Sequence, residues 1–264
     1  MAEWLGAGLQ NLSQWFDSAT HLQKCPWTRS GGICVSKVPR DKSPILGIDF
    51  LSETSEICAL IMQTLKTDTR KRILAVSRKL FLEKGFQGAT TREIAAASGV
   101  TLSNLYHYYP SKDELFRVLL KPATDALEGL LAERHGQTGY DIAKIREDGY
   151  AAEELEEYMG IIRKHRNSLK MLLFKSQGSS LEGFKEYYVE KATRSVLDWF
   201  KLMKAKYTGM DFDVSEFFIH LNNVWMFTLL EEILMHDLPE EETRAVLSDY
   251  VRFELIGWKK MMKI

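Results

Sequence analysis

The spacing of apolar residues from Thr67 to the end of the chain constrains the fold more than any other feature. These residues recur every three or four positions, which is the period of an α-helix. No alternating, strand-like run bounded by turn residues interrupts them. The pattern therefore predicts an all-α fold. The first strong helix is expected over 67–84, with one face formed by Ile73, Val76, Ser77, Leu80 and Phe81.

Glycine, proline and capping residues divide this pattern into separate helices. Gly85 is expected to end the first helix, because glycine readily takes the left-handed conformation of a helix C-terminus. Two short helices follow, and a long helix begins after Ser111, whose hydroxyl can form a capping box with Glu114. Pro122 should bend this long helix without ending it. The ends of the two short helices are expected at Thr90 or Thr91, Gly99, Thr101 or Ser103, and Pro110.

The rest of the chain continues the helical pattern. Its breaks coincide with glycine, serine and proline positions, which favour turns. The expected helices lie near 111–135, 150–165, 167–177, 181–207, 213–236 and 239–262.

The first 61 residues have a different composition. They contain all three cysteines, Cys25, Cys34 and Cys58, none in a C-x-x-C spacing, so no disulfide framework, metal or cofactor is expected. Only Trp4, Leu5, Leu9, Leu12, Trp15 and Phe16 suggest a short amphipathic helix. Met62 stands directly before the periodic region. We expect a poorly specified leader over 1–61, a first helical domain over 62–115 and a second helical domain over 116–264.

Charge is distributed unevenly along the chain. Residues 66–121 hold 11 basic and 5 acidic side chains, whereas residues 122–264 hold 19 basic and 25 acidic ones. A small basic part beside an acidic part is typical of a protein whose basic part contacts a polyanion, although chance clustering of solvated charges would look the same. No secretory signal and no uncharged apolar run of 18 residues occurs, so a cytoplasmic protein without membrane contact is expected.

Two short helices joined by the turn Ala97-Ser98-Gly99-Val100 lie inside this basic segment. Such a pair is the physical description of a helix-turn-helix, whose second helix enters the major groove of DNA. The sequence TTREIAAASGVTLSNLYHYYPSKDELF, residues 90–116, closely resembles the DNA-binding domain of the tetracycline-repressor-like (TetR/AcrR) family. The likeness extends back through 80–86 and 72–74. The resemblance implies a three-helix DNA-binding head and a ligand-responsive regulator, usually a repressor, that binds palindromic double-stranded operator DNA as a homodimer.

The resemblance also implies which residues meet DNA. Arg92 can bind guanine bidentately, whereas Leu102 departs from the polar residue common at its position and could touch only an apolar base edge. Tyr109 is expected in the core, Tyr106 on a phosphate, and His107 either on DNA or simply on the surface. The full set of expected DNA contacts is Thr91, Arg92, Thr101, Leu102, Ser103, Tyr106, His107, Tyr108 and Lys112.

The penultimate expected helix carries apolar residues on nearly every side, which is typical of a helix buried all round, and the final helix is apolar on two faces. One face would pack inside the protomer and the other against a second copy, as a four-helix bundle; a wholly intramolecular core is the alternative. The residues expected at this dimer interface are Phe218, Trp225, Tyr250, Gly257, Trp258 and Met261. The resemblance further implies a pocket for an unknown small-molecule effector. Its candidate residues are Tyr150, Met159, Phe174, Tyr187 and Trp225.

Two other classes of protein were weighed. An enzyme would need a catalytic motif, and none of G-x-S-x-G, G-x-x-x-x-G-K-[ST], H-E-x-x-H or G-x-G-x-x-G occurs, so no catalytic residue is expected. Glu232 and His236 share a helix face but are expected to be a solvated pair. A helical protein-interaction adaptor without DNA binding remains the alternative function, and salt-dependent binding to duplex DNA would distinguish the two.

Overall fold

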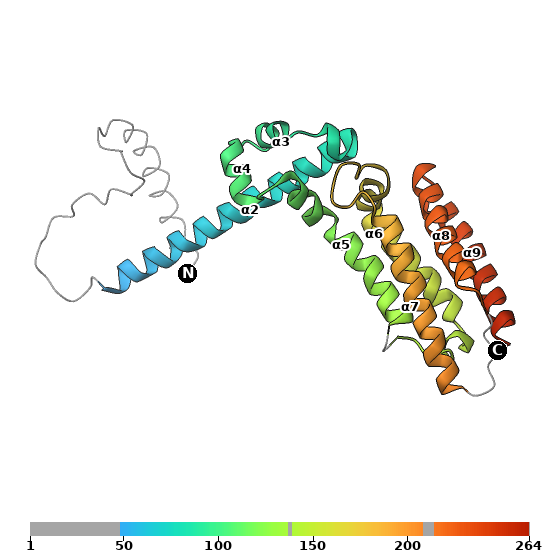
Figure 1. Ribbon diagram of the computed structural model, residues 1–264. Helices are drawn as coiled ribbons and strands as arrows, with labels where there is room; N and C mark the ends of the chain where they lie inside the picture. The colour runs from blue at the N-terminus through green and yellow to red at the C-terminus, as the bar shows by residue number, and fades with distance from the viewer. Residues whose placement is uncertain (1–47, 137–138, 208–213, 264) are drawn as a thin grey trace, which may run out of the picture. The chain divides into compact units, whose positions relative to one another are not determined.

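The regular structure of the described residues is helical throughout, which confirms the all-α prediction over that part of the chain. The computed structural model describes residues 48–136, 139–207 and 214–263, with side chains from Gln63 onward. Figure 1 shows the order of the elements along the chain. They are α2 (Ile48–Gly88), α3 (Thr91–Ala97), α4 (Leu102–Tyr108), α5 (Lys112–His135), η2 (Lys144–Arg146), α6 (Tyr150–Phe174), α7 (Phe184–Lys206), α8 (Glu216–Met235) and α9 (Glu240–Met262).

The first described helix, α2, starts earlier than expected. It begins at Ile48 and not near Thr67, and the physical reason is that no glycine or proline occurs between Ile48 and Lys84 to stop it. The helix suggested by Trp4 and its neighbours lies outside the described residues. Residues 57–264 cluster into one compact unit, and the boundary between a leader and the DNA-binding domain stays a prediction.

Gly85 interrupts α2 as expected. Its backbone has φ 72° and ψ 174°, a conformation that a residue with a Cβ rarely adopts. The redirected chain lets the amide of Phe86 donate to the carbonyl of Lys175, at 2.8 Å, on the segment that follows α6. This hydrogen bond therefore joins the helices α2 to α4, which we call the head, to the rest of the protein.

Side-chain caps fix the starts of the short helices. Thr90 forms a complete capping box: its hydroxyl accepts from the Glu93 amide at 3.2 Å, while the Glu93 carboxylate accepts from the Thr90 amide at 3.0 Å. That carboxylate also pairs with Lys84 of α2 at 2.6 Å, and these contacts lower the pKa of Glu93 to about 2. Thr101 caps α4 and Ser111 caps α5, each by accepting a backbone amide.

The helices after α5 follow the expected order with one correction. The segments 150–165 and 167–177 were expected to be two helices, but α6 is a single helix from Tyr150 to Phe174. No glycine or proline separates the two segments, and the chain turns only around Gly178, which has φ 78°. Pro122 lies inside α5 without ending it.

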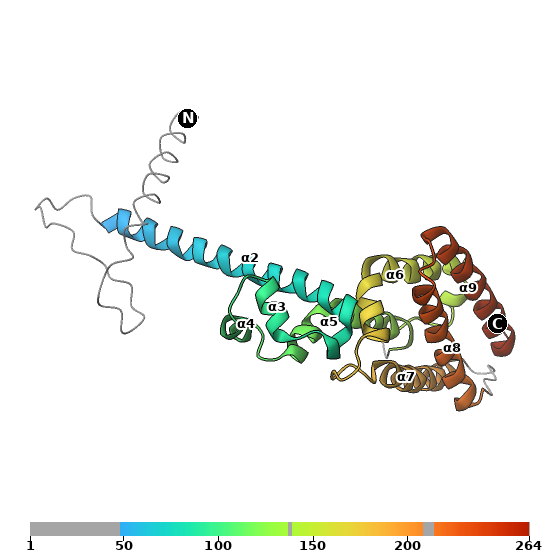
Figure 2. The ribbon, with the colours of Figure 1, turned by 90° about the horizontal axis from the view of Figure 1, so that it is seen from above.

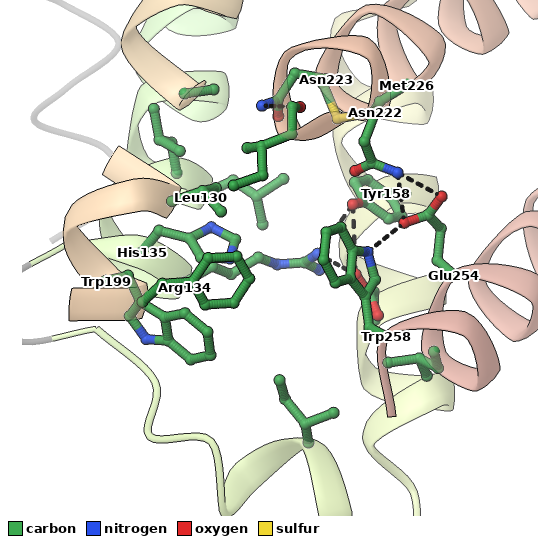
Figure 3. A pocket seen from close by; sticks show the side chains of 18 of the residues that line it. Leu130, Arg134, His135, Tyr158, Trp199, Asn222, Asn223, Met226, Glu254 and Trp258 are labelled. Atoms are coloured by element: carbon green, nitrogen blue, oxygen red, sulfur yellow. Dashed lines mark hydrogen bonds and ion pairs between the residues drawn. The ribbon is translucent and has the colours of Figure 1, made fainter. Parts of the chain in front are cut away.

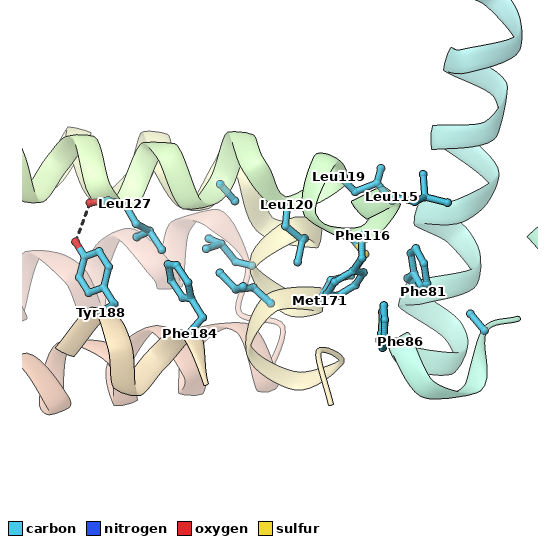
Figure 4. Close-up of a cluster of buried hydrophobic side chains, with 14 of the residues drawn as sticks. Phe81, Phe86, Leu115, Phe116, Leu119, Leu120, Leu127, Met171, Phe184 and Tyr188 are labelled. Carbon is cyan, nitrogen blue, oxygen red and sulfur yellow. Dashed lines mark hydrogen bonds between the residues drawn. The ribbon is translucent and has the colours of Figure 1, made fainter. Parts of the chain in front are cut away.

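A single hydrophobic cluster connects the head with the helices behind it (Figure 4). Phe116 at the start of α5 is fully buried and packs its ring 5.0 Å from Phe81 and 5.1 Å from Phe86. Met171 of α6 and Leu120 of α5 belong to the same cluster. The head is therefore packed onto the remaining helices and is not merely tethered to them.

The helices from α5 to α9 form the second part, which we call the body. α5 packs on α6, α6 on α9 and α7 on α8, so that the last two helices lie along one side of the body (Figure 2). No helix in the described part of the chain has the length and apolarity needed to cross a membrane.

Candidate nucleic-acid interface and ligand cavity

The turn between α3 and α4 has the tight geometry of a helix-turn-helix. Gly99 has φ 63°, and its amide donates to the carbonyl of Ala96 at 3.1 Å. Arg72 of α2 reaches across and donates from Nε to the carbonyl of Ser98 at 2.8 Å. α2 therefore holds the turn, which sets the angle at which α4 leaves α3.

α4 has one buried side and one exposed side. Leu105 and Tyr109 point into the core with 1% and 2% of their surface exposed, which confirms the expectation for Tyr109. Leu102 and Tyr108 are half-buried and pack against that core. The residues left exposed along α4 and its cap are Thr101, Ser103, Asn104, Tyr106 and His107.

Arg92 extends this exposed side from α3, where it is also exposed. The hydroxyls of Thr91 and Tyr106 lie 3.3 Å apart, so the two helices present their polar groups side by side. Asn104 was not among the expected DNA contacts. Its position next to Ser103 on a capped helix was the signal that could have found it.

Lys112 is oriented differently from the expectation that it meets the DNA backbone. Its ammonium donates to the carbonyls of Phe86 and Ala89, at 2.7 and 3.1 Å, and lies 4.2 Å from the centre of the Phe86 ring. Burial lowers the pKa of Lys112. This orientation depends on the chain after the interruption at Gly85, because the two acceptor carbonyls belong to Phe86 and Ala89. Two of its three N–H groups are thus engaged inside the protein, and a phosphate contact stays a prediction.

The body contains a cavity of about 140 Å³. It lies among α5, α6, α7, α8 and α9, and Figure 3 shows the side chains that surround it. Tyr150 lines it as expected for the effector pocket. The other four candidates lie elsewhere: Met159 is buried in a separate cluster, Phe174 packs beside the head, and Tyr187 and Trp225 are 47% and 43% exposed. Their apolar helical spacing could not show which cluster or surface each side chain would join.

One wall of the cavity holds a buried cation. Arg134 is 7% exposed; its guanidinium pairs with Glu154, pairs with Glu157 at 2.6 Å and donates to the Tyr158 hydroxyl at 2.9 Å. Its Nε has no hydrogen-bond partner among the described residues. Burial raises the pKa of Glu154. The two carboxylates together more than neutralise the single positive charge.

The opposite wall holds a carboxylate without a cation. Glu254 accepts from the Asn222 amide at 2.7 and 2.9 Å and from the Trp258 indole N–H at 2.7 Å, as the dashed lines in Figure 3 show. Burial raises the pKa of Glu254, although both hydrogen-bond donors oppose the rise. All three residues line the cavity.

Sequence reasoning missed Arg134 and Glu254, although a signal was present. Arg134 follows Leu127 and Leu131 at seven and three positions, so it occupies the apolar face of α5. Glu254 follows Leu247 by seven positions on α9 in the same way. A charged residue at a core position of an amphipathic helix is the feature that marks such a site.

The exposed side of α8 and α9 carries most of the expected dimer residues. A groove between the two helices is lined by Phe218, Trp225, Gly257, Trp258 and Met261, together with neighbours such as Phe253. Tyr250 differs: it is 9% exposed and lines the cavity inside the protomer. Its spacing on α9 puts it on the side that faces α6, with its ring 6.4 Å from Tyr158. The expectation that α8 is buried all round is not met within one protomer, since Phe217 remains 68% exposed.

Among the described residues, no group of three or more His, Cys, Asp or Glu side chains could hold a metal ion. Glu232 and His236 form an exposed pair at 3.1 Å.

Comparison with known proteins agrees with this geometry. The sequence pattern of the family described as "Bacterial regulatory proteins, tetR family" matches residues 73–119, from α2 into α5. HTH-type transcriptional repressor KstR2 of Rhodococcus jostii (strain RHA1) is 34% identical over 68 residues, which are 26% of this chain and 33% of that protein. HTH-type transcriptional regulator UidR of Escherichia coli (strain K12) is 36% identical over 59 residues, 22% of this chain and 30% of that protein.

These sequence matches span about a third of the length of the curated relatives. A solved structure extends the likeness of the fold. A putative TetR-family transcriptional regulator from Syntrophomonas wolfei is 17% identical, with a TM-score of 0.50 over 73% of this chain and 97% of that one. Residues 73–119, with their helix-turn-helix geometry, are therefore similar to the tetR family of bacterial regulatory proteins, and the solved structure shows the same kind of all-helical fold.

Proposed function

We propose that this chain is a cytoplasmic transcriptional repressor that binds operator DNA through α4 and releases it when a small molecule enters the cavity of the body. The observation that carries the proposal is the exposed polar side of α4, held at a fixed angle by the turn at Gly99 and by Arg72. The repressor activity of the relative KstR2 supports the direction of regulation.

The exposed side of α4 is suited to the major groove. Ser103, Asn104 and His107 carry donors and acceptors that can read base edges, and the Tyr106 hydroxyl can reach a phosphate. Arg92 on α3 supplies the guanidinium that pairs bidentately with guanine. Further cations are exposed along α2 at Lys66, Arg70, Lys71, Arg78 and Lys79, where they would add sequence-independent attraction to the DNA backbone.

A homodimer follows from the apolar surface of the last two helices. Phe217, Phe253 and Ile256 are each at least 64% exposed, and a contiguous apolar surface of this kind marks an interaction site. A second copy of the same surface is the partner we propose, because one head reads only a few base pairs and a two-fold axis places two heads one helical turn apart on DNA.

α5 connects the cavity to the head. Arg134, near the end of α5, lines the cavity, and Asp113, in its first turn, accepts from both the amide and the hydroxyl of Ser180 at 2.7 Å. Phe116, one turn further on, is packed between the head and the body. We therefore propose that a molecule in the cavity shifts α5 and changes the spacing of the two heads.

The test is operator binding by the full chain. A duplex is selected from a random-sequence library, and its Kd is measured at several salt concentrations by fluorescence anisotropy. We expect Arg92→Ala to weaken binding by about 5- to 150-fold, equivalent to roughly 1–3 kcal/mol, and to relax the preference at one base pair. Lys201→Ala, an exposed lysine on α7, is the matched control and should bind as the wild type does.

Two results would contradict the proposal. Wild-type affinity in the double variant Arg92→Ala and Asn104→Ala would remove α3 and α4 from the DNA interface. A complete lack of salt-dependent binding to any duplex would instead favour the protein-interaction adaptor, which needs no phosphate contacts.

A further inference from the structure

The charges around the cavity are unbalanced. Its lining includes one arginine and two glutamates, and the arginine is already paired with Glu154 and with Glu157. Glu254 receives hydrogen bonds only from the neutral donors Asn222 and Trp258. The described surroundings of the cavity therefore hold more carboxylates than cations, and Glu254 is the lining carboxylate that has no cationic partner among the described residues.

This arrangement disfavours an anionic ligand. The two terminal nitrogens of Arg134 are occupied by carboxylates and by the Tyr158 hydroxyl, so neither is available to a ligand carboxylate or phosphate. An anion entering the cavity would also approach Glu254 without a compensating cation. A buried charge without a partner is strongly unfavourable.

The walls are of the kind that bind cations. Tyr150, Tyr158, Trp199, Tyr250 and Trp258 line the cavity with aromatic rings. Ring faces attract positive charge, and the attraction grows when the charge is removed from water. Arg134 already uses this effect, since its guanidinium carbon lies 4.7 Å from the centre of the Tyr158 ring.

Size limits the choice further. An apolar cavity of about 150 Å³ can hold a molecule such as benzene, and this cavity measures about 140 Å³. A second, nearly apolar cavity of about 40 Å³ shares the wall residues Leu130, Tyr158, Tyr188, Met226 and Tyr250. An apolar substituent would extend in that direction.

We propose that the cavity binds a small organic ammonium compound, with its charged nitrogen held by Glu254 and the aromatic walls. The inference rests on the proposed function in one respect only, that occupation of this cavity regulates DNA binding. The chemical class of the ligand follows from the cavity itself.

The test compares three probes of nearly equal shape with the full-length protein. Choline is the cation, 3,3-dimethylbutan-1-ol is its uncharged carbon isostere, and 3,3-dimethylbutanoate is the anion. Binding is measured by isothermal titration calorimetry and by ligand-observed NMR. We expect choline to bind at least ten times more tightly than the alcohol and the anion to bind most weakly.

The variant Glu254→Gln keeps the shape and the hydrogen-bond capacity of the side chain but removes its charge. It should reduce the preference for choline over the alcohol to less than threefold and leave the affinity for the alcohol unchanged. Glu190→Gln, an exposed glutamate on α7, is the matched control and should keep the full preference. Melting temperatures of both variants check that the fold is intact.

Several outcomes would overturn the inference. Equal affinity for choline and the alcohol, tighter binding of the anion, or no binding of any probe would each exclude a cation site. A Glu254→Gln variant that alters the sedimentation coefficient but keeps the preference for choline would assign Glu254 to the dimer interface instead.

Failure of the proposed function is recognised separately, by loss of operator binding or by operator release that no ligand affects. Selective choline binding without operator release would support the cation site and contradict only its regulatory role.

Discussion

The pKa of His135 is set by its surroundings more than by its residue type. It lines the cavity, half-buried, with its ring 5.5 Å from Trp199 and next to the positive charge of Arg134. Burial, followed by the charge of Arg134, lowers the pKa of His135 to about 4. The ring is therefore neutral at pH 7, and the cavity gains no positive charge from it.

This shift predicts a dependence of stability on pH. The unfolded chain binds a proton at His135 below its ordinary pKa of about 6.5, whereas the folded protein resists protonation until about pH 4. The stabilisation is therefore present above pH 6.5 and is lost as the pH falls toward 4. We expect the free energy of unfolding of the wild type to fall by up to about 3 kcal/mol more than that of His135→Gln between pH 7 and pH 4.

Urea denaturation of both proteins across this pH range measures the difference. Other groups titrate in the same interval, but they are common to both proteins and cancel in the comparison. Parallel stability curves would show that His135 is as easily protonated in the folded protein as in the unfolded one.

Among the elements, α5 has the most consequential position, because it belongs to the body and its first turns pack against the head. Its first turn is joined to the loop after α6 by the contact between Asp113 and Ser180. The amide of Phe86 adds a second link, to the carbonyl of Lys175. The start of α5 and the residue after Gly85 are therefore both anchored to the segment that follows α6.

Removing the Phe116 side chain, which packs between the head and the body, should destabilise both parts together. Phe116 is fully buried among Phe81 and Phe86, so Phe116→Ala is expected to lower the free energy of unfolding by about 3–5 kcal/mol. Hydrogen exchange should accelerate in α3 and α4 as well as in α6. Leu202→Ala, which is 47% exposed on α7, should change stability by no more than about 0.5 kcal/mol. Faster exchange confined to the head would show that the two parts are not cooperatively linked.

At the scale of the whole molecule, the apolar side of α8 and α9 is explained best by a second copy. Trp258 was the obvious residue to test from the sequence, but its indole also holds Glu254 and lines the cavity. Phe253 is a cleaner choice because it is 64% exposed and touches chiefly Trp225, at 5.3 Å between ring centres.

We expect Phe253→Glu to convert a dimer into a monomer and to weaken operator binding with it. A carboxylate in the middle of an apolar interface would be buried without a partner when the two copies associate. Leu202→Glu places the same charge on an exposed apolar site outside this surface and should remain dimeric. Sedimentation velocity decides between them, and an unchanged coefficient for Phe253→Glu would move the dimer interface elsewhere.

The sequence by itself determined the local features of this protein. Helix period, the glycine at position 99 and the capping residues Thr90, Thr101 and Ser111 act over one or two turns of chain, so their effect can be predicted without knowing the fold. The core position of Tyr109 was predictable for the same reason. The start of α2 was missed, although the lack of glycine and proline over 48–84 was a local signal for a longer helix.

Only the tertiary structure decided which residues share the cavity. Arg134, Glu154 and Glu254 come from α5, α6 and α9, and their meeting depends on how those helices pack, which no local period encodes. The same packing turned Tyr250 inward and left Trp225 outside, although both lie on apolar helix faces. The position of the Lys112 ammonium was likewise set by the carbonyls of Phe86 and Ala89, which are distant in sequence. A long flexible side chain can donate to buried acceptors that the fold brings near it.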